Sequence, residues 1–271
     1  MSIKLVAIDL DGTLLNSHNV ISLENKRTIQ EVRNKGVKVV LASGRPLSGV
    51  IPFEEELGIK GSEEYAVVFN GAVIQNLAGR VLMTKKLTYR DFLTMIKFQR
   101  LAKVNLHFET TNGFYTCDHD LSVQMQINAA FTNNIMKVRN KNEISQDFTF
   151  NKVGFTCDLE SDEIEKLWHN LPEWAFEKYD IVRSADCCIE LNSKGASKGD
   201  ALANLADRLD IRENEVMIFG DQDNDRSMFA NPNFKKIAMG NAISSIKEQA
   251  DYITATNDAN GVAKGLKKYI L

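Results

Sequence analysis

An apolar run at residues 3–8 ends directly at the segment Asp9-Leu10-Asp11-Gly12-Thr13. The run is typical of a buried strand, and the glycine permits a sharp turn after it. Ligands of open α/β sheets bind outside the carboxyl ends of the strands, which is where these two carboxylates stand. Two acids there repel each other unless a cation or a shared proton lies between them. Mg²⁺ fits, because it is usually held by one or two carboxylates and a phosphate. An isolated Asp-x-Asp is also common on surfaces, so other segments have to support this interpretation.

The composition excludes several classes of protein. A chain of 271 residues has room for one large domain or two modest ones, and 44% hydrophobic residues suffice for an ordinary globular core. With 33 basic and 36 acidic residues the net charge is −3, which gives no sign of a nucleic-acid partner. No apolar stretch has the length of a membrane span, and Asp9 interrupts the only apolar run near the N-terminus. We therefore expect a cytoplasmic protein without a membrane partner.

Cysteines and histidines show no metal-binding spacing and no Cys-x-x-Cys motif. We expect reduced, buried thiols rather than a disulfide framework or a zinc site, and surface or packing roles for the imidazoles. The residues concerned are Cys117, Cys157, Cys187 and Cys188 and His18, His107, His119 and His169.

Apolar runs alternate with helical patterns at both ends of the chain, which predicts an α/β fold with a Rossmann-like parallel sheet covered on both faces. One helix is expected to begin at Ser22 and to end at Lys35-Gly36, where a cation and a glycine form a good carboxyl cap. A second helix is expected at residues 197–209. The further strands are expected at residues 37–42, 65–69, 215–219, 236–239 and 252–254.

The middle of the chain has a different pattern. Helices are expected at residues 89–103 and 162–171, and Asn112-Gly113 is a hairpin signal between two short strands. Residues 150–157 and 181–191 are each expected to form one strand. We predict a core (catalytic) domain at residues 1–84 and 192–271, and an inserted α+β cap domain at residues 85–191.

Four polar segments share one kind of position, because each follows a predicted strand of the core or opens its helix. A parallel sheet gathers its strand ends at one edge, so we expect these segments to meet in space. They are Asp9-Leu10-Asp11, Ser43-Gly44-Arg45-Pro46, Lys198-Gly199 and Gly220-Asp221-Gln222-Asp223-Asn224-Asp225.

The side chains of these segments suit a phosphate and a metal ion. The Ser43 hydroxyl and the Gly44 N–H are donors for phosphate oxygens. Lys198 can neutralise the charge of a phosphate. The helix macrodipole disfavours a cation at a helix start, which favours a functional role for Lys198, and a solvated surface lysine is the alternative. Asp221 is the expected third metal ligand, with a polar loop that caps the next helix as the alternative.

In order, spacing and total length, these segments resemble the four motifs of the haloacid dehalogenase-like hydrolases. The likeness extends to the Cof-type phosphatases with a cap between the second and third motifs, and is closest to the YidA-type sugar phosphatases. Asn70-Gly71-Ala72 also falls where these proteins have it. The resemblance covers essentially the whole chain.

The resemblance implies a Mg²⁺-dependent phosphomonoester hydrolase that acts on small phosphorylated metabolites, above all sugar phosphates. Asp9 would attack phosphorus and become an aspartyl-phosphate, and Asp11 would protonate the leaving alkoxide and then activate water. Mg²⁺ would be held by the Asp9 carboxylate, the Asp11 backbone carbonyl and Asp221. The phosphoryl group would be held by the Leu10 backbone, Ser43, Gly44, Lys198 and Asn224, while Asp225 would orient Lys198 or a metal-bound water.

Two other functions fit part of the pattern. A phosphohexomutase on the same scaffold would return the phosphoryl group to a sugar hydroxyl. A receiver-type signalling domain also places a phospho-accepting Asp beside an acidic pair, a Ser or Thr and a Lys, although this chain is about twice the size that such a domain needs. The sequence does not name the substrate, the cap residues that select it, the open or closed state of the cap, or the oligomeric state.

Overall fold

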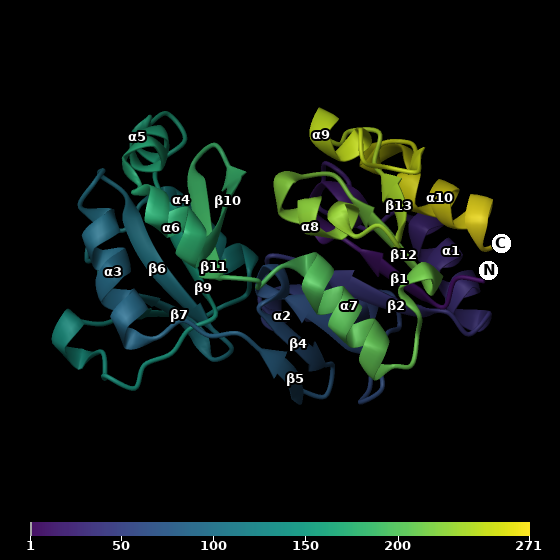
Figure 1. Ribbon diagram of the computed structural model, residues 1–271, viewed down its shortest axis with the longest axis horizontal. Coiled ribbons are helices and arrows are strands. Elements are labelled where there is room, and N and C mark those ends of the chain that lie inside the picture. Colours follow the sequence, from purple (N-terminus) through teal and green to yellow (C-terminus); the bar gives the residue numbers. More distant parts are fainter. Residues whose placement is uncertain (1) are drawn as a thin grey trace. The chain divides into compact units, whose positions relative to one another are not determined.

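The first apolar run forms β1, Leu5–Ile8, a strand buried along its whole length in the computed structural model, which describes residues 2–271. The chain divides into two compact units (Figure 1). Unit 1 runs up to Gly44, from Val50 to Met83 and from Ser197 to Leu271, while unit 2 comprises Arg45–Gly49 and Thr84–Ala196. The mixed α/β class expected from the sequence is confirmed.

Unit 1 is built on an eight-stranded sheet. Its strands are β1, β2 (Lys38–Ala42), β3 (Tyr65–Val68), β4 (Val73–Asn76), β5 (Val81–Thr84), β12 (Val216–Gly220), β13 (Lys235–Ala238) and β14 (Tyr252–Ile253). They are ordered β14-β13-β12-β1-β2-β3-β4-β5. All pairings from β14 to β3 are parallel, and β4 returns antiparallel to β3. In register, Ile8 lies between Leu41 of β2 and Phe219 of β12.

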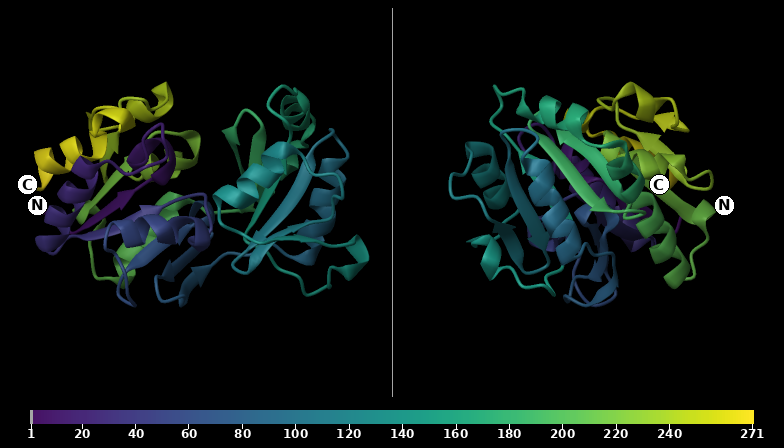
Figure 2. Two further views of the ribbon diagram at one scale, coloured as in Figure 1. Left: turned by 180° about the vertical axis from the view of Figure 1, so that it is seen from behind. Right: turned by 60° about the vertical axis from the view of Figure 1, so that its left-hand side comes forward.

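The helices of unit 1 cover this sheet. They are α1 (Leu23–Asn34), α2 (Leu47–Glu56), α7 (Lys198–Arg208), α8 (Arg226–Ala230), α9 (Ser244–Lys247) and α10 (Gly261–Tyr269). From β1 the chain steps to β2 through α1, whereas β12 steps to β13 in the opposite direction through α8. Right-handed connections therefore put α1 and α8 on opposite faces. Helix α10 (yellow) packs beside α1 (purple) (Figure 2). Helix α7 packs beside α8. Strand β1 is thus the point where the strand order reverses, which is where open α/β sheets bind ligands.

Helix α7 begins at the expected residue, because its N-cap and its apolar face both agree with the pattern in the sequence. Ser197 is the N-cap, and its hydroxyl accepts a hydrogen bond from the Asp200 N–H at 3.2 Å. The apolar positions at 201, 202, 205, 206 and 209 were expected to form one face of this helix; Ala201, Leu202, Leu205 and Ala206 are buried, whereas Leu209, at the C-cap, is half-buried.

Unit 2 contains a six-stranded sheet in the order β10-β11-β9-β6-β7-β8. Its strands are β6 (Asn105–Thr110), β7 (Gly113–Thr116), β8 (Met136–Val138), β9 (Lys152–Thr156), β10 (Tyr179–Ala185) and β11 (Cys188–Ser193). Its helices are α3 (Tyr89–Gln99), α4 (Val123–Phe131), α5 (Glu163–Asn170) and α6 (Glu173–Lys178). All pairings are antiparallel except that of β7 with β8.

The two faces of this sheet differ in chemistry, because successive side chains of a strand point to opposite faces. One face joins α3, α5 and α6 in an apolar core that includes Phe92, Phe108 and Leu167. Lys152 stands on the other face, where its Nζ lies 2.9 Å from Glu109 Oε1 and 2.8 Å from Glu190 Oε1. Lys152 and Glu109 are buried, so each charge depends on its partner.

One strand expected from the sequence is wrong. Residues 181–191 do not form a single strand but the hairpin of β10 and β11, with Asp186 and Cys187 between them. The turn contains no glycine or asparagine, and the pairing register shifts between Arg183 and Ala185, so the apolar run gives no clear turn signal. All four cysteines are free, as expected, and three of them are buried. Within residues 2–271, no helix has the length and apolarity needed to span a membrane.

Candidate active site

Three of the four polar segments leave neighbouring strands at the same edge of the unit 1 sheet. Asp9 follows β1, Ser43 follows β2, and Asp221 follows β12. Lys198 is the first residue of α7 and reaches the same place, because its Nζ lies 2.6 Å from Asp9 Oδ1. The parallel register therefore assembles residues that are up to about 210 positions apart in the chain.

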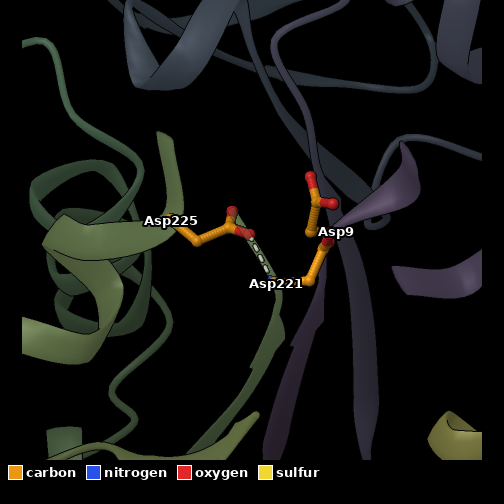
Figure 3. Close-up of side chains that lie close together, drawn as sticks. All are labelled: Asp9, Asp221 and Asp225. Atoms are coloured by element: carbon orange, nitrogen blue, oxygen red, sulfur yellow. Dashed lines mark hydrogen bonds between the residues drawn. The ribbon is translucent and has the colours of Figure 1, made fainter. Parts of the chain in front are cut away.

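Three buried aspartates form the centre of the site (Figure 3). Asp9, Asp221 and Asp225 each offer a carboxylate oxygen within 4.8 Å of the others. Figure 3 shows the Asp9 and Asp221 carboxylates close together and the Asp225 carboxylate approaching from the α8 side. This acidic group contains Asp9 and Asp221, whose carboxylates were expected as metal ligands, and adds Asp225. Asp11 was expected to offer only its backbone carbonyl, and its side chain is exposed.

Lys198 is the cation of this group, and its side chain is 0% exposed. Its Nζ lies 2.7 Å from Asp225 Oδ1, in addition to its contact with Asp9. Burial alone would lower the pKa of Lys198, but the charges of Asp225 and Asp9 outweigh it and raise that pKa above its ordinary value. Lys198 therefore stays charged, and its place at a helix start is explained by these two partners.

Asp225 is fully committed to protein contacts. Its Oδ1 pairs with Lys198, and its Oδ2 accepts the N–H groups of Asp221 at 2.8 Å and Gln222 at 3.2 Å. Gly220 is required beside it, because a Cβ there would lie 2.6 Å from Asp225 Oδ2. Asp225 thus orients both Lys198 and the loop that carries Asp221.

Asp9 and Asp221 each use one oxygen within the protein. Asp9 Oδ1 contacts Lys198, and Asp221 Oδ1 accepts a hydrogen bond from Thr13 Oγ1 at 2.7 Å. Their Oδ2 atoms accept no hydrogen bond from the described part of the chain. A turn at Gly12, with φ of +78°, brings Asp221 Oδ2 to 2.5 Å from where a Cβ of residue 12 would stand. Only glycine leaves that oxygen accessible.

The electrostatics of the site show a shortage of positive charge. The pKa of Asp9 is raised well above its ordinary value, because burial and the charge of Asp225 outweigh the attraction of Lys198. Burial and the same Asp225 charge raise the pKa of Asp221 to about 7. One lysine does not balance three carboxylates, and a divalent cation held by Asp9 and Asp221 would favour the ionised form of both. The donor set, two carboxylate oxygens in a buried site, fits Mg²⁺.

The residues expected to hold a phosphoryl group stand at or near the strand ends that carry these aspartates. Ser43 is buried at the end of β2, and its carbonyl accepts the N–H of Asn70 at 3.0 Å. Asn224 Nδ2 lies 3.4 Å from Asn70 Oδ1. Leu10, also buried, follows Asp9 directly in the chain. Asn70 thus links the Ser43 and Asn224 segments.

The chain matches a family model over residues 6–266, and that family is described as the haloacid dehalogenase-like hydrolases. The chain belongs to this family. The resemblance noted in the sequence is confirmed, and with it the expectation of an enzyme.

Relatives of this hydrolase are phosphatases by name. It is 35% identical to the phosphatase YwpJ of Bacillus subtilis, over 97% of this chain and 99% of that protein. It is 32% identical to another Bacillus subtilis protein, a 5-amino-6-(5-phospho-D-ribitylamino)uracil phosphatase, over 100% of this chain and 97% of that protein. The expectation of a phosphatase of this family is thereby confirmed.

Solved structures agree with this assignment. A haloacid dehalogenase-like hydrolase from Bacillus subtilis superposes with a TM-score of 0.83 at 31% identity, over 98% of this chain and 99% of that one. A second, from Bacteroides thetaiotaomicron, gives 0.84 at 28% identity, over 98% and 99%.

Two residues of the hydrolase site were given no individual role from the sequence. Thr13, inside the first motif, is completely buried and binds Asp221. Asn70 stands in the Asn-Gly pair after β3, and that pair was the available signal. Neither contact partner lies near in the sequence, so no local pattern connects them.

Proposed function

We propose that this enzyme hydrolyses small phosphomonoesters, sugar phosphates above all, with Mg²⁺ and through an aspartyl-phosphate on Asp9. The observation that carries the proposal is the buried Asp9 carboxylate, which lies 2.6 Å from the Lys198 ammonium and shares its cluster with Asp221. All proposed site residues belong to unit 1. We assign the chemistry to that unit, and we propose the segment at residues 85–191 as the cap that selects the leaving group.

Asp9 is the proposed nucleophile. A carboxylate that attacks a phosphate dianion must overcome the repulsion between the two anions. The ion pair with Asp225 holds the Lys198 ammonium next to Asp9. Its positive charge therefore offsets part of that repulsion without any rearrangement. Asp9 Oδ1 accepts a hydrogen bond from Lys198, and Oδ2 is the carboxylate oxygen that this contact does not use.

Asp11 is the proposed acid and base. It follows Asp9 by two residues, and its side chain is exposed, so it can meet a leaving alkoxide or a water. Asp11 donates a proton to the leaving oxygen, and it later takes a proton from the water that attacks the aspartyl-phosphate. Proton transfer of this kind contributes roughly 10²–10⁴-fold to a rate.

Mg²⁺ would be held by Asp9 and Asp221, together with the backbone carbonyl of Asp11. When bound, it supplies Lewis-acid neutralisation of the phosphoryl charge. The Ser43 hydroxyl, the N–H groups of Leu10 and Gly44, and the Asn224 carboxamide are proposed to hold the phosphoryl oxygens. The Lys198 ammonium completes this set.

The substrate class rests on chemistry and on one relative. The phosphoryl pocket binds the part that all monoesters share, so it favours no particular leaving group. The relative named as a 5-amino-6-(5-phospho-D-ribitylamino)uracil phosphatase acts on a phosphate carried by a ribityl chain. This supports phosphorylated sugars and sugar alcohols as the first compounds to test. The cytoplasmic location stays a prediction.

A phosphate-release screen of the purified protein tests this proposal. Sugar phosphates, nucleotides and cofactor phosphates are supplied with Mg²⁺, and parallel reactions contain a chelator. We expect orthophosphate from sugar phosphates only when Mg²⁺ is present. Interconversion of hexose phosphates without release of orthophosphate would instead establish a mutase, and a stable aspartyl-phosphate without turnover would establish a receiver. Either result overturns the proposal.

A further inference from the structure

The turn after β3 has an unusual backbone. Phe69, Asn70 and Gly71 have φ angles of 53°, 55° and 93°, so three successive residues lie in the left-handed region. Glycine adopts this conformation freely and asparagine tolerates it, whereas it is rare for a bulky aromatic residue. All three residues are buried, and the surrounding structure must hold the turn in place.

Asn70 contacts two segments that are proposed to bind the phosphoryl group. Its backbone N–H donates to the Ser43 carbonyl at 3.0 Å, which fixes the peptide that leads to Gly44. Its Oδ1 accepts from Asn224 Nδ2 at 3.4 Å. The same Oδ1 would lie 2.7 Å from a Cβ on Gly44, so the carboxamide packs directly against that glycine.

Gly71 brings the turn against a third segment. A Cβ on Gly71 would lie 2.2 Å from the Ser197 carbonyl oxygen and 2.7 Å from the Lys198 backbone nitrogen. The turn therefore lies in close contact with the first peptide of α7, which carries the Lys198 ammonium. A relaxed, extended backbone at residues 69–71 would withdraw both Asn70 and Gly71 from these contacts.

We propose that Asn70 is a positioning residue that sets the geometry of the phosphoryl-binding groups. It acts through its contacts with Ser43-Gly44 and Asn224. The strained turn that contains Asn70 also packs, through Gly71, against the backbone of Lys198. This inference rests on the proposed function. It explains why a conformation costly for Phe69 is kept at a strand end of the site, since strained backbone persists where neighbouring contacts over-determine it.

The test uses two substitutions of Asn70 in the full-length enzyme. Asn70→Gly keeps the left-handed backbone and removes only the carboxamide, whereas Asn70→Ala also disfavours the backbone conformation. Asn260→Gly is the matched control, because Asn260 has a similar φ of 58° in unit 1 and takes no part in the proposed site. Hydrolysis of an aryl phosphate, inhibition by orthophosphate, calorimetric Mg²⁺ affinity and thermal unfolding are measured for each variant.

We expect Asn70→Gly to lower kcat/KM by about 10- to 100-fold, the loss typical of donors misplaced by an ångström. Inhibition by orthophosphate should weaken in parallel. Mg²⁺ affinity should stay that of the wild type, because the two hydrogen bonds given above link Asn70 to Ser43 and Asn224 and not to Asp9 or Asp221. Asn70→Ala should lose more, and Asn260→Gly should match the wild type.

The result that overturns the role of Asn70 is an active wild type whose Asn70→Gly variant keeps both its kcat/KM and its orthophosphate inhibition. Parallel loss of Mg²⁺ affinity or of folding in Asn70→Gly would also overturn it, since the role would then be structural. A wild type without Mg²⁺-dependent hydrolysis overturns the proposed function and this inference together.

Discussion

Thr13 Oγ1 donates a hydrogen bond of 2.7 Å to Asp221 Oδ1, although 208 residues separate the two in the chain. The bond is buried and fixes one oxygen of Asp221, a residue that shares its acidic cluster with Asp9. Thr13 thus joins the turn after β1 to the loop after β12. The proposed metal site depends on this pairing of two strand ends.

Thr13→Val should weaken Mg²⁺ binding, because valine keeps the shape of the side chain and removes the donor. Residues that orient metal ligands in this way typically contribute about 10- to 100-fold to affinity. Calorimetric titration with Mg²⁺ measures the loss, and Thr13→Ser should restore most of it. Thr254→Val is the control, because Thr254 also donates a buried hydrogen bond, to the Gly261 carbonyl. Equal Mg²⁺ affinity in Thr13→Val and the wild type would refute this role.

Asp9→Asn should abolish turnover and leave the fold intact. The carboxamide has nearly the size of the carboxylate but cannot form an acyl phosphate. Burial already disfavours the charge of Asp9, so its removal should not lower stability. Steady-state assays should show a loss well over 10²-fold, while Asp251→Asn, an exposed aspartate of unit 1, should behave as the wild type. More than about one per cent residual activity would favour direct attack by water.

Calcium should inhibit the enzyme that magnesium activates. Ca²⁺ takes 6–8 oxygens at longer distances than Mg²⁺, so it would engage both oxygens of Asp9 and spoil its line of attack. Rates measured in mixtures of the two ions should fall as Ca²⁺ replaces Mg²⁺. Full activity after exhaustive chelation would remove Asp9 and Asp221 from the set of metal ligands.

Glu54 in α2 should make the protein less stable as the pH rises. It is 1% exposed, neither carboxyl oxygen has a hydrogen-bond partner in the described chain, and burial raises its pKa from 4.5 to about 8. The folded state therefore keeps a proton that the unfolded state loses above pH 4.5, so stability is full below that pH and declines until pH 8.

Glu54→Gln should remove this decline. The free energy of unfolding in urea should be measured at pH 5, 7 and 9. Relative to the wild type, that of the variant should rise with pH and be higher by a few kcal/mol at pH 9. Glu55→Gln, an exposed neighbour, serves as the control. Parallel stability curves for Glu54→Gln and the wild type would show that Glu54 does not carry this pH dependence.

Local patterns in the sequence were enough to predict much of the framework. The apolar run before Asp9 does form a fully buried strand, and Ser197 does cap a helix in which four of the five expected apolar positions are buried. These features depend on residues that are close in the chain, so periodicity and capping rules apply to them. The order of the motifs was likewise sufficient to predict the family.

The tertiary structure alone decided how the site residues pair. Lys198 was ambiguous in the sequence, and only its packing against Asp9 and Asp225 makes it a buried cation. The sequence placed Asp225 in a segment near the site, but only the fold of its loop brings the Asp225 carboxylate within the acidic cluster. The turn at Asp186-Cys187 lacks the usual turn residues. These outcomes depend on contacts between distant segments, and the energies of such contacts come from burial and charge pairing after the sheet has formed.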